Sequence, residues 1–346
     1  SLPLGYRIGS CCSPSLVRVQ ALDAGADHRP RNPGNGIRSL DWRIDAATKE
    51  GKNTMGLSGH RPRRDYESPE RLPLRQYFEE CPLDRIECLY NFAYLPEDKI
   101  DRLRHAALPE DWGRQNKVLK RYLALHVGLA VRQEKYVQQD VGLIFCAGQL
   151  QTRLGNPLYL RFEENKQQKP AYYLQYVGEA LNSWASLPQP PDYPAWPTIS
   201  PGAEIVLAGE HILSDHSERI GLLRELPSIA RVCALTGAIH WALFRDLAIK
   251  QLYYGIPSYF VPIYLQSRDD ITEPPDLIAP IQVQDNKIYV RTALEPHMAY
   301  PSARIVSTRH DKLPTWLLQA WEDYCAEQGD DDYEDDYEGG SPEERS

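Results

Sequence analysis

The densest group of titratable side chains lies in the segment Gly209–His216, which reads GEHILSDH. If this segment is helical, His211 and Asp215 are four residues apart and share a face. Imidazole and carboxylate groups bind metals and exchange protons, so His211 is a candidate acid–base residue. Only two metal ligands are local, however, and a polar cluster at the start of a helix accounts for the same residues. We therefore predict no metal site.

Two further segments carry groups that could bind a ligand. In Glu295–Arg304, Tyr300 and Arg304 have helical spacing, and an arginine can clamp a phosphate or carboxylate in a bidentate way. A structural salt bridge is the simpler explanation and the one the spacing favours. The second segment, Gly148–Arg153, is a polar turn directly after an apolar run, where ligand-binding groups are often presented. Arg153 is its candidate residue.

Tyrosine is the third feature with chemical potential, since the chain has 21 of them. Many, including the candidate ligand-binding residue Tyr259, lie in segments that read as strands. Tyrosine beside arginine can stack the bases of single-stranded RNA. Ordinary strand propensity and half-buried packing explain the same enrichment, and we favour that explanation for most of them.

The elements that must position these residues follow from hydrophobic periodicity. An apolar stripe predicts an amphipathic helix over 115–135, and the longest helical pattern covers Pro227–Lys250. Shorter helices are expected at 97–107, 296–305 and 313–325. Short runs rich in β-branched and aromatic residues predict strands at 136–138, 141–146, 158–162, 171–177, 258–265, 277–283 and 288–293. Asp285-Asn286 is the expected hairpin turn between the last two strands.

Strand–helix alternation is too sparse for a doubly wound sheet. We predict an α+β fold in which a mostly antiparallel sheet is backed by a long central helix, with an N-terminal helical segment. Residues 71–325 are expected to form a single domain. Residues 1–70 are expected to be a flexible, mildly basic segment, and residues 326–346 an acidic disordered tail.

The net charge of −9 is unevenly distributed. Residues 326–346 contain ten carboxylates and one arginine, so the rest of the chain is neutral overall. This excludes a basic, nucleic-acid-type charge balance for the whole body but leaves a local basic patch open. The tail could bind a basic partner or mask a basic patch of the chain itself.

Motif searches give mainly absences. There is no P-loop, dinucleotide-binding glycine motif, nucleophile elbow or zinc-protease motif, and we expect no cofactor. The seven cysteines show no C-x-x-C pair, which favours free, mostly buried thiols in a reducing compartment. No apolar run approaches the ~18 residues of a membrane span. We expect an intracellular protein, cytoplasmic or nuclear.

Several segments in a fixed order resemble domain-of-unknown-function family 3825 over about residues 73–320. They are Phe92–Pro96, Ala107–Trp112, Leu119–Leu123, Phe145–Leu150, Glu210–Ile212, Pro257–Tyr259, Met298–Arg304 and Trp316–Leu317. The resemblance implies a link to RNA metabolism by association only. The chain departs from the family pattern at Cys146-Ala147, His297 and Pro301-Ser302. These departures imply a retained fold with a lost activity.

Three functional hypotheses remain. The one we favour is a non-catalytic or degenerate domain that binds RNA or a ribonucleoprotein partner. The second is an enzyme for a phosphate-containing nucleotide or RNA substrate, which requires His211, Tyr259, Tyr300 and Arg304 to share one pocket. The third is an assembly scaffold, which requires an exposed apolar patch. The sequence leaves catalysis, the ligand and the oligomeric state open.

Overall fold

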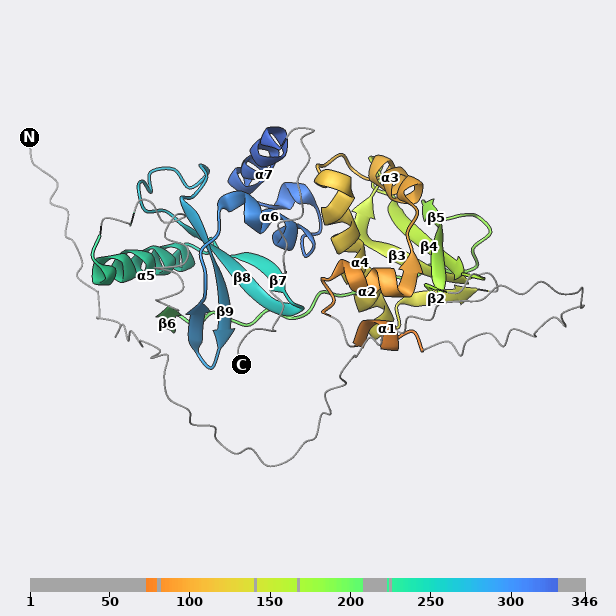
Figure 1. Ribbon diagram of the computed structural model, residues 1–346, viewed down its shortest axis with the longest axis horizontal. Coiled ribbons are helices and arrows are strands. Elements are labelled where there is room, and N and C mark those ends of the chain that lie inside the picture. The colour runs from red at the N-terminus through yellow and green to blue at the C-terminus, as the bar shows by residue number, and fades with distance from the viewer. Residues whose placement is uncertain are drawn as a thin grey trace, which may run out of the picture. The chain divides into compact units, whose positions relative to one another are not determined.

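The computed structural model describes residues 73–79, 82–139, 142–166, 169–207, 223 and 226–328 (Figure 1). The fold class is α+β, as the sequence predicts, with an N-terminal helical segment ahead of the strands. The helices are α1 (Gln76–Glu79), α2 (Ile86–Phe92), α3 (Glu97–Ala106), α4 (Lys117–Arg132), α5 (Ser228–Phe244), α6 (Pro296–Arg304) and α7 (Thr315–Glu327). Two short 3₁₀ turns, η1 (Arg114–Asn116) and η4 (His310–Lys312), accompany them.

The strands form two mixed sheets instead of the single sheet we expected. The first has the order β1 (Ala93–Tyr94), β5 (Tyr172–Gly178), β4 (Pro157–Glu164), β3 (Gly142–Gln151), β2 (Tyr136–Gln139). The second has the order β6 (Glu204–Leu207), β10 (Lys287–Val290), β9 (Leu277–Gln284), β8 (Ile256–Ile263), β7 (Ile249–Tyr253). Only the β1–β5 and β6–β10 pairs are parallel, so both sheets are mostly antiparallel.

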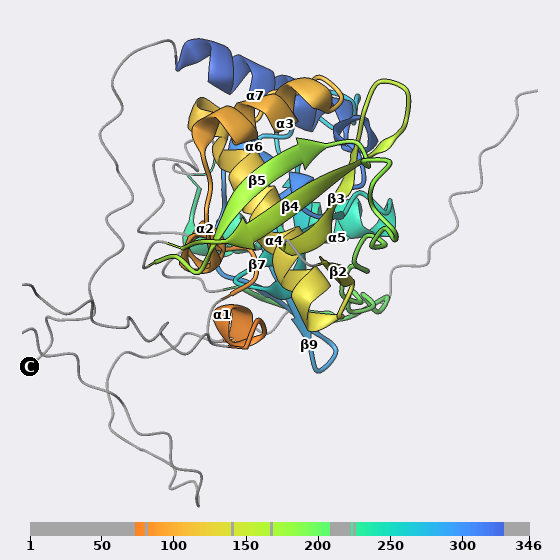
Figure 2. The same ribbon diagram turned by 90° about the vertical axis from the view of Figure 1, so that its right-hand side faces the viewer.

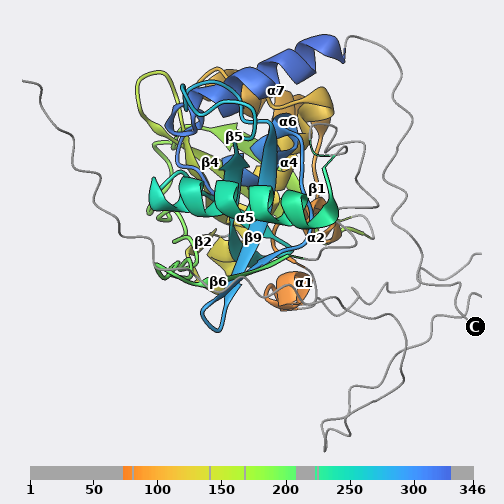
Figure 3. The same cartoon turned by 90° about the vertical axis from the view of Figure 1, so that its left-hand side faces the viewer.

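Each sheet has its own long helix, so no single central helix backs the fold. Helix α4 is the predicted amphipathic helix, and it crosses one face of the first sheet (Figure 2). Its apolar residues belong to the same core as Phe145 of β3 and Phe162 of β4. Helix α5 packs on β8 of the second sheet, where Leu235 and Ile239 meet Val261 (Figure 3).

The expected helix over Pro227–Lys250 is too long. It ends at Phe244 because Asp246 adopts a left-handed backbone with φ 56°, and Ile249 then begins β7. The apolar residues of β7 continue the helical spacing of the apolar residues of α5, so the sequence pattern did not reveal the strand. The hairpin turn at Asp285-Asn286 is confirmed, since both residues have positive φ between paired strands β9 and β10.

Helix α6 joins the elements around the candidate site. It contacts α4, α7 and β7, and one apolar core continues from the first sheet through α6 to β7 and β8. Pro296 in its first turn suits a helix start because that position needs no amide hydrogen. Helix α7 runs to Glu327, two residues beyond the expected domain end. Residues 1–70 and most of the expected tail lie outside the described residues.

The cysteines only partly match expectation. Cys146 is a buried free thiol whose pKa burial raises to about 12, whereas free Cys233 is exposed. Cys88 is disulfide-bonded, which corrects the expectation of thiols throughout. Among the described helices, none has the length and apolarity needed to cross a membrane.

Candidate functional site

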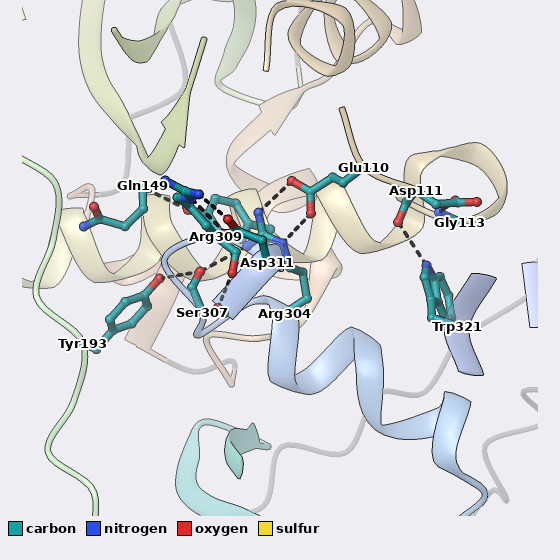
Figure 4. A network of polar contacts seen from close by, with 11 residues as sticks. Glu110, Asp111, Gly113, Gln149, Tyr193, Arg304, Ser307, Arg309, Asp311 and Trp321 are labelled. Atoms are coloured by element: carbon teal, nitrogen blue, oxygen red, sulfur yellow. Dashed lines mark hydrogen bonds and ion pairs between the residues drawn. The ribbon is translucent and has the colours of Figure 1, made fainter. Parts of the chain in front are cut away.

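Arg304, the last residue of α6, is the centre of a buried polar network (Figure 4). Its Nε and Nη2 donate to the two carboxylate oxygens of Glu110 at 2.5 and 2.7 Å. Its Nη1 donates to the backbone carbonyl of Ser307 at 3.1 Å. This bidentate geometry is the strongest form of an arginine–carboxylate pair. One arginine therefore fixes the loop before α4 to the segment after α6.

The Arg304–Glu110 pair is sealed from solvent. The two side chains are only 2% and 3% exposed, and the guanidinium lies 4.8 Å from the ring centre of Trp112 and 5.1 Å from that of Tyr122. Burial alone would lower the pKa of Arg304, but the hydrogen bonds and charge of Glu110 outweigh it and raise that pKa. The positive charge of Arg304 is thus permanent and already matched.

Helix α7 supports the same loop from the other side. Trp321 stacks on Tyr300 at 4.7 Å with the rings 9° apart, and its indole Nε1 donates to the carbonyl of Asp111 at 3.0 Å. The Asp111 carboxylate accepts the backbone N–H of Gly113 at 2.7 Å. Tyr300 is itself buried, and burial raises its pKa. Its hydroxyl is therefore neutral and its ring is a packing surface.

A histidine–glycine contact holds the end of β3. The ring of His126 on α4 lies against Gly148, whose φ of +61° suits glycine and where a Cβ would overlap the imidazole. Tyr122 stacks on His126 at 4.1 Å, and its hydroxyl accepts the backbone N–H of Gln149 at 2.7 Å. Burial, with the nearby charge of Arg304, lowers the pKa of His126 to about 3. His126 is a neutral core residue, as its place on the apolar stripe suggests.

Beside this network is a cavity of about 10 Å³. Glu110 and Arg304 line it together with Gln149 and Gln151 from the end of β3, and with Thr308 and Arg309 after α6. This volume accommodates about one water molecule and no phosphate group. Arg309 at the rim is paired with the Asp311 carboxylate. The cluster is therefore built to hold three chain segments together.

The structure brings only two of the predicted site residues together, Tyr300 and Arg304. Arg153 is exposed in the turn after β3 and does not line the cavity. Tyr259 lies on β8, and its hydroxyl donates to the carbonyl of Pro197 at 2.8 Å. His211 lies outside the described residues. Tyr259 thus does not line the cavity beside Arg304, although the enzyme hypothesis requires it to do so.

A second region exposes aromatic and basic side chains at the β7–β8 hairpin, and its two tyrosines are among the strand tyrosines that the sequence suggests could stack RNA bases. Tyr253 and Tyr254 are 52% and 50% exposed, and their rings meet edge to face at 4.6 Å. The guanidinium of Arg85 lies 4.6 Å from the ring centre of Tyr254. Lys250, paired with Tyr259 across the strands, lies 5.1 Å from the ring centre of Trp196. We call Arg85, Trp196, Lys250, Tyr253 and Tyr254 the hairpin surface.

Sequence signals existed for parts of both regions. The pair Tyr254-Gly255 between two strand-like runs is a turn signature, since glycine favours the second position of a tight hairpin. No local pattern predicts that Glu110 pairs with Arg304, because 194 residues separate them. Nor does any spacing place Arg85 over Tyr254.

Comparison with known proteins gives a family but no characterised relative. The model of the family described as a domain of unknown function, DUF3825, matches residues 103–313, more than half of the chain. The match covers Glu110, Tyr122, Gly148 and Arg304 and is shorter than the resemblance seen in the sequence. No curated protein and no solved structure matches the chain. The chain belongs to the DUF3825 domain family.

Proposed function

We propose that the protein is a non-catalytic module that binds single-stranded RNA, alone or within a ribonucleoprotein, through the hairpin surface. Single-strand binders combine aromatic rings, on which bases stack, with basic groups that follow the backbone. Tyr253 and Tyr254 supply exposed rings, and Arg85 and Lys250 supply the positive charges.

The backbone of Tyr254 is the observation that carries this proposal. Strand β7 ends at Tyr253 and β8 begins at Ile256, so Tyr254 and Gly255 form a two-residue turn. Both have positive φ, 49° and 75°, as a type I′ turn requires. Asparagine is the favoured first residue of such a turn, and a bulky residue there is strained. A strained, half-exposed tyrosine beside an arginine fits a residue kept for binding.

The basic groups near these rings suit phosphate contacts. The Arg85 guanidinium lies over the Tyr254 ring, 4.6 Å from its centre, and a guanidinium beside an aromatic ring can still donate N–H groups to phosphate oxygens. Lys250 is exposed on strand β7, three residues before Tyr253. Because base stacking is tolerant of sequence, we expect weak sequence preference and strong salt dependence.

The alternative enzyme hypothesis finds less support. Arg304 would have to leave Glu110 and its aromatic neighbours to reach a phosphate, and breaking a buried ion pair is costly. We therefore assign Arg304 a positioning role and keep Arg153 as an exposed candidate for a phosphate contact. The Arg153→Ala variant should weaken RNA binding and reduce the salt slope by about one.

The direct test is fluorescence anisotropy with a single-stranded RNA pool of random sequence at low salt. Tyr254→Asn should lower affinity by roughly 5- to 100-fold, because each stacked base contributes about 1–3 kcal/mol. It should also fold normally, since asparagine suits the turn. The matched control is Tyr94→Asn, which removes a tyrosine 59% exposed on β1 of the other sheet and should leave affinity unchanged.

Two results would reject the proposal. One is the absence of binding to any single-stranded RNA pool at low salt. The other is equal loss of affinity in Tyr254→Asn and Tyr94→Asn, because the hairpin surface would then have no special part in binding.

The acidic C-terminal segment offers a related test. Beyond Gln328 the chain carries nine carboxylates and one arginine. If this segment competes with RNA for the basic groups of the hairpin surface, deletion of residues 329–346 should strengthen binding at low salt. A cut at residue 326 would instead remove the end of α7.

A further inference from the structure

Helix α5 has an unusual outward face. Its 17 residues contain a single charged side chain, Arg231, so the helix is apolar almost all round although it lies on the surface of the second sheet (Figure 3). A helix of this kind is normally buried on both sides. Its inner face packs in the core, and its outer face exposes Ile229 and Phe244, which are 65% and 89% exposed.

The outward residues form one stripe. Four exposed residues and the half-buried His240 follow each other at intervals of three or four, which places them on a single face of the helix: Ile229, Cys233, Gly237, His240 and Phe244. Large apolar side chains stand at both ends of this stripe. The side chains in its middle, those of Cys233 and Gly237, are small. We call these five residues the α5 stripe.

The described residues give no packing reason for Gly237. A Cβ at this position would meet none of their atoms within 4 Å, so alanine would fit and would favour the helix more. Glycine in a helix centre is useful where another backbone approaches closely. The open side of Gly237 therefore points to contact with something outside the fold.

We propose that the α5 stripe is a self-complementary interface through which two copies of this chain pair, with their α5 helices antiparallel. The midpoint between Ile229 and Phe244 falls beside Gly237. A two-fold axis there sets Ile229 of one copy against Phe244 of the other, and the small residues face each other at the closest approach. The stripe itself carries no carboxylate, lysine or arginine, so its own side chains bring no like charges together.

The available area fits a weak dimer. The helix is about 25 Å long, and an aromatic side chain buries roughly 150–250 Å² when fully covered. Two copies of Phe244 and Ile229, with the small residues between them, approach the ~1,000 Å² lower limit for specific interfaces. Interfaces near this limit belong mostly to weak, transient pairs, so the dimer should depend on protein concentration.

Sedimentation equilibrium of the full chain, with reducing agent and from about 1 to 100 µM, tests the proposal. Wild-type protein should shift from monomer to dimer across this range. Gly237→Leu should remain monomeric because its side chain blocks close approach, while its melting temperature should not fall. Leu154→Asp is the matched control, since Leu154 is 86% exposed at a distant turn and its loss should leave the dimer intact.

The arrangement itself is tested by cross-linking. A Cys233→Ser, Gly237→Cys variant should form a disulfide-linked dimer on mild oxidation, and a Cys233→Ser, Leu154→Cys variant should not. A wild-type chain that stays monomeric at 100 µM would overturn the proposal, even if α5 then bound another protein. Dimers that persist in Gly237→Leu would overturn it too, and absence of the 237–237 cross-link would overturn the antiparallel arrangement.

Discussion

The Arg304 cluster and the hairpin surface contain similar residue types but use them in opposite ways. In the cluster, Arg304 is buried beside the rings of Trp112 and Tyr122, and its positive charge is neutralised by the carboxylate of Glu110. On the hairpin surface, Arg85 and Lys250 stack on aromatic rings at the surface of the fold, and two neighbouring tyrosines are half exposed. An arginine beside aromatic rings is therefore no evidence of a binding site until its burial and its partner are known.

The two regions differ in the property that restricts which residues they can contain, which we propose is folding stability in one and binding in the other. In the cluster, removing one partner of the ion pair leaves a buried charge, and adding a side chain at Gly148 creates a steric overlap, so the penalty falls on folding. On the hairpin surface, Tyr254 occupies a backbone conformation that suits another residue better, so its presence calls for a reason other than folding. Variants should separate the two regions by whether stability or binding changes.

Arg304→Met should produce the largest effect on stability. It leaves the Glu110 carboxylate buried without its partner, which should cost about 3–5 kcal/mol in the free energy of unfolding. Urea unfolding measures it. The double variant Glu110→Leu, Arg304→Met should recover most of this loss, because no buried charge remains. If Arg304→Met alone were as stable as wild type, the cluster would not have the structural role assigned to it.

Acid should destabilise the cluster through His126. Its pKa is about 3 in the folded chain and near 6.5 when unfolded, so between these values only the unfolded chain takes up the proton. This contribution to stability is constant well above pH 6.5 and falls as the pH drops, by about 2 kcal/mol between pH 6.5 and 4.5. Urea unfolding of wild type and His126→Asn across this range isolates it, and parallel pH profiles would contradict the burial of a neutral histidine.

Gly148→Ala should destabilise the fold by about 2 kcal/mol. The positive φ and the overlap with the His126 ring both oppose a side chain at this position. Because part of the penalty comes from that overlap, the double variant with His126→Ala should lose less than the sum of the two single changes. Strict additivity in a double-mutant cycle would mean that the two residues do not press on each other.

Tyr254→Asn should have the smallest effect on stability and the opposite sign. Asparagine suits the left-handed turn position, so unfolding should need about 0.5 kcal/mol more free energy than in wild type. Thermal or urea unfolding measures this change. A marked loss of stability would show that Tyr254 is kept for packing, and the contrast between the two regions would disappear.

Local patterns predicted the parts of the fold that local interactions determine. The stripe on α4 and the Asp285-Asn286 turn are examples, since neighbours in sequence specify both. Strand β7 was missed because its apolar residues continue the helical period of α5. For the site, helical spacing correctly predicted that Tyr300 and Arg304 lie close together. The burial of Arg304 and its pairing with Glu110 depend on contacts between distant parts of the chain, which spacing does not reveal. The division into two sheets is a long-range property of the same kind.

Ultraviolet cross-linking of the wild-type chain to single-stranded RNA, followed by mass spectrometry of the cross-linked peptides, compares the two regions in one measurement. If RNA binds the hairpin surface, cross-links should form on the peptide that contains Tyr253 and Tyr254, and none on residues 300–307, where Tyr300 and Arg304 are buried. Cross-links concentrated on residues 300–307, with none at the β7–β8 hairpin, would contradict it.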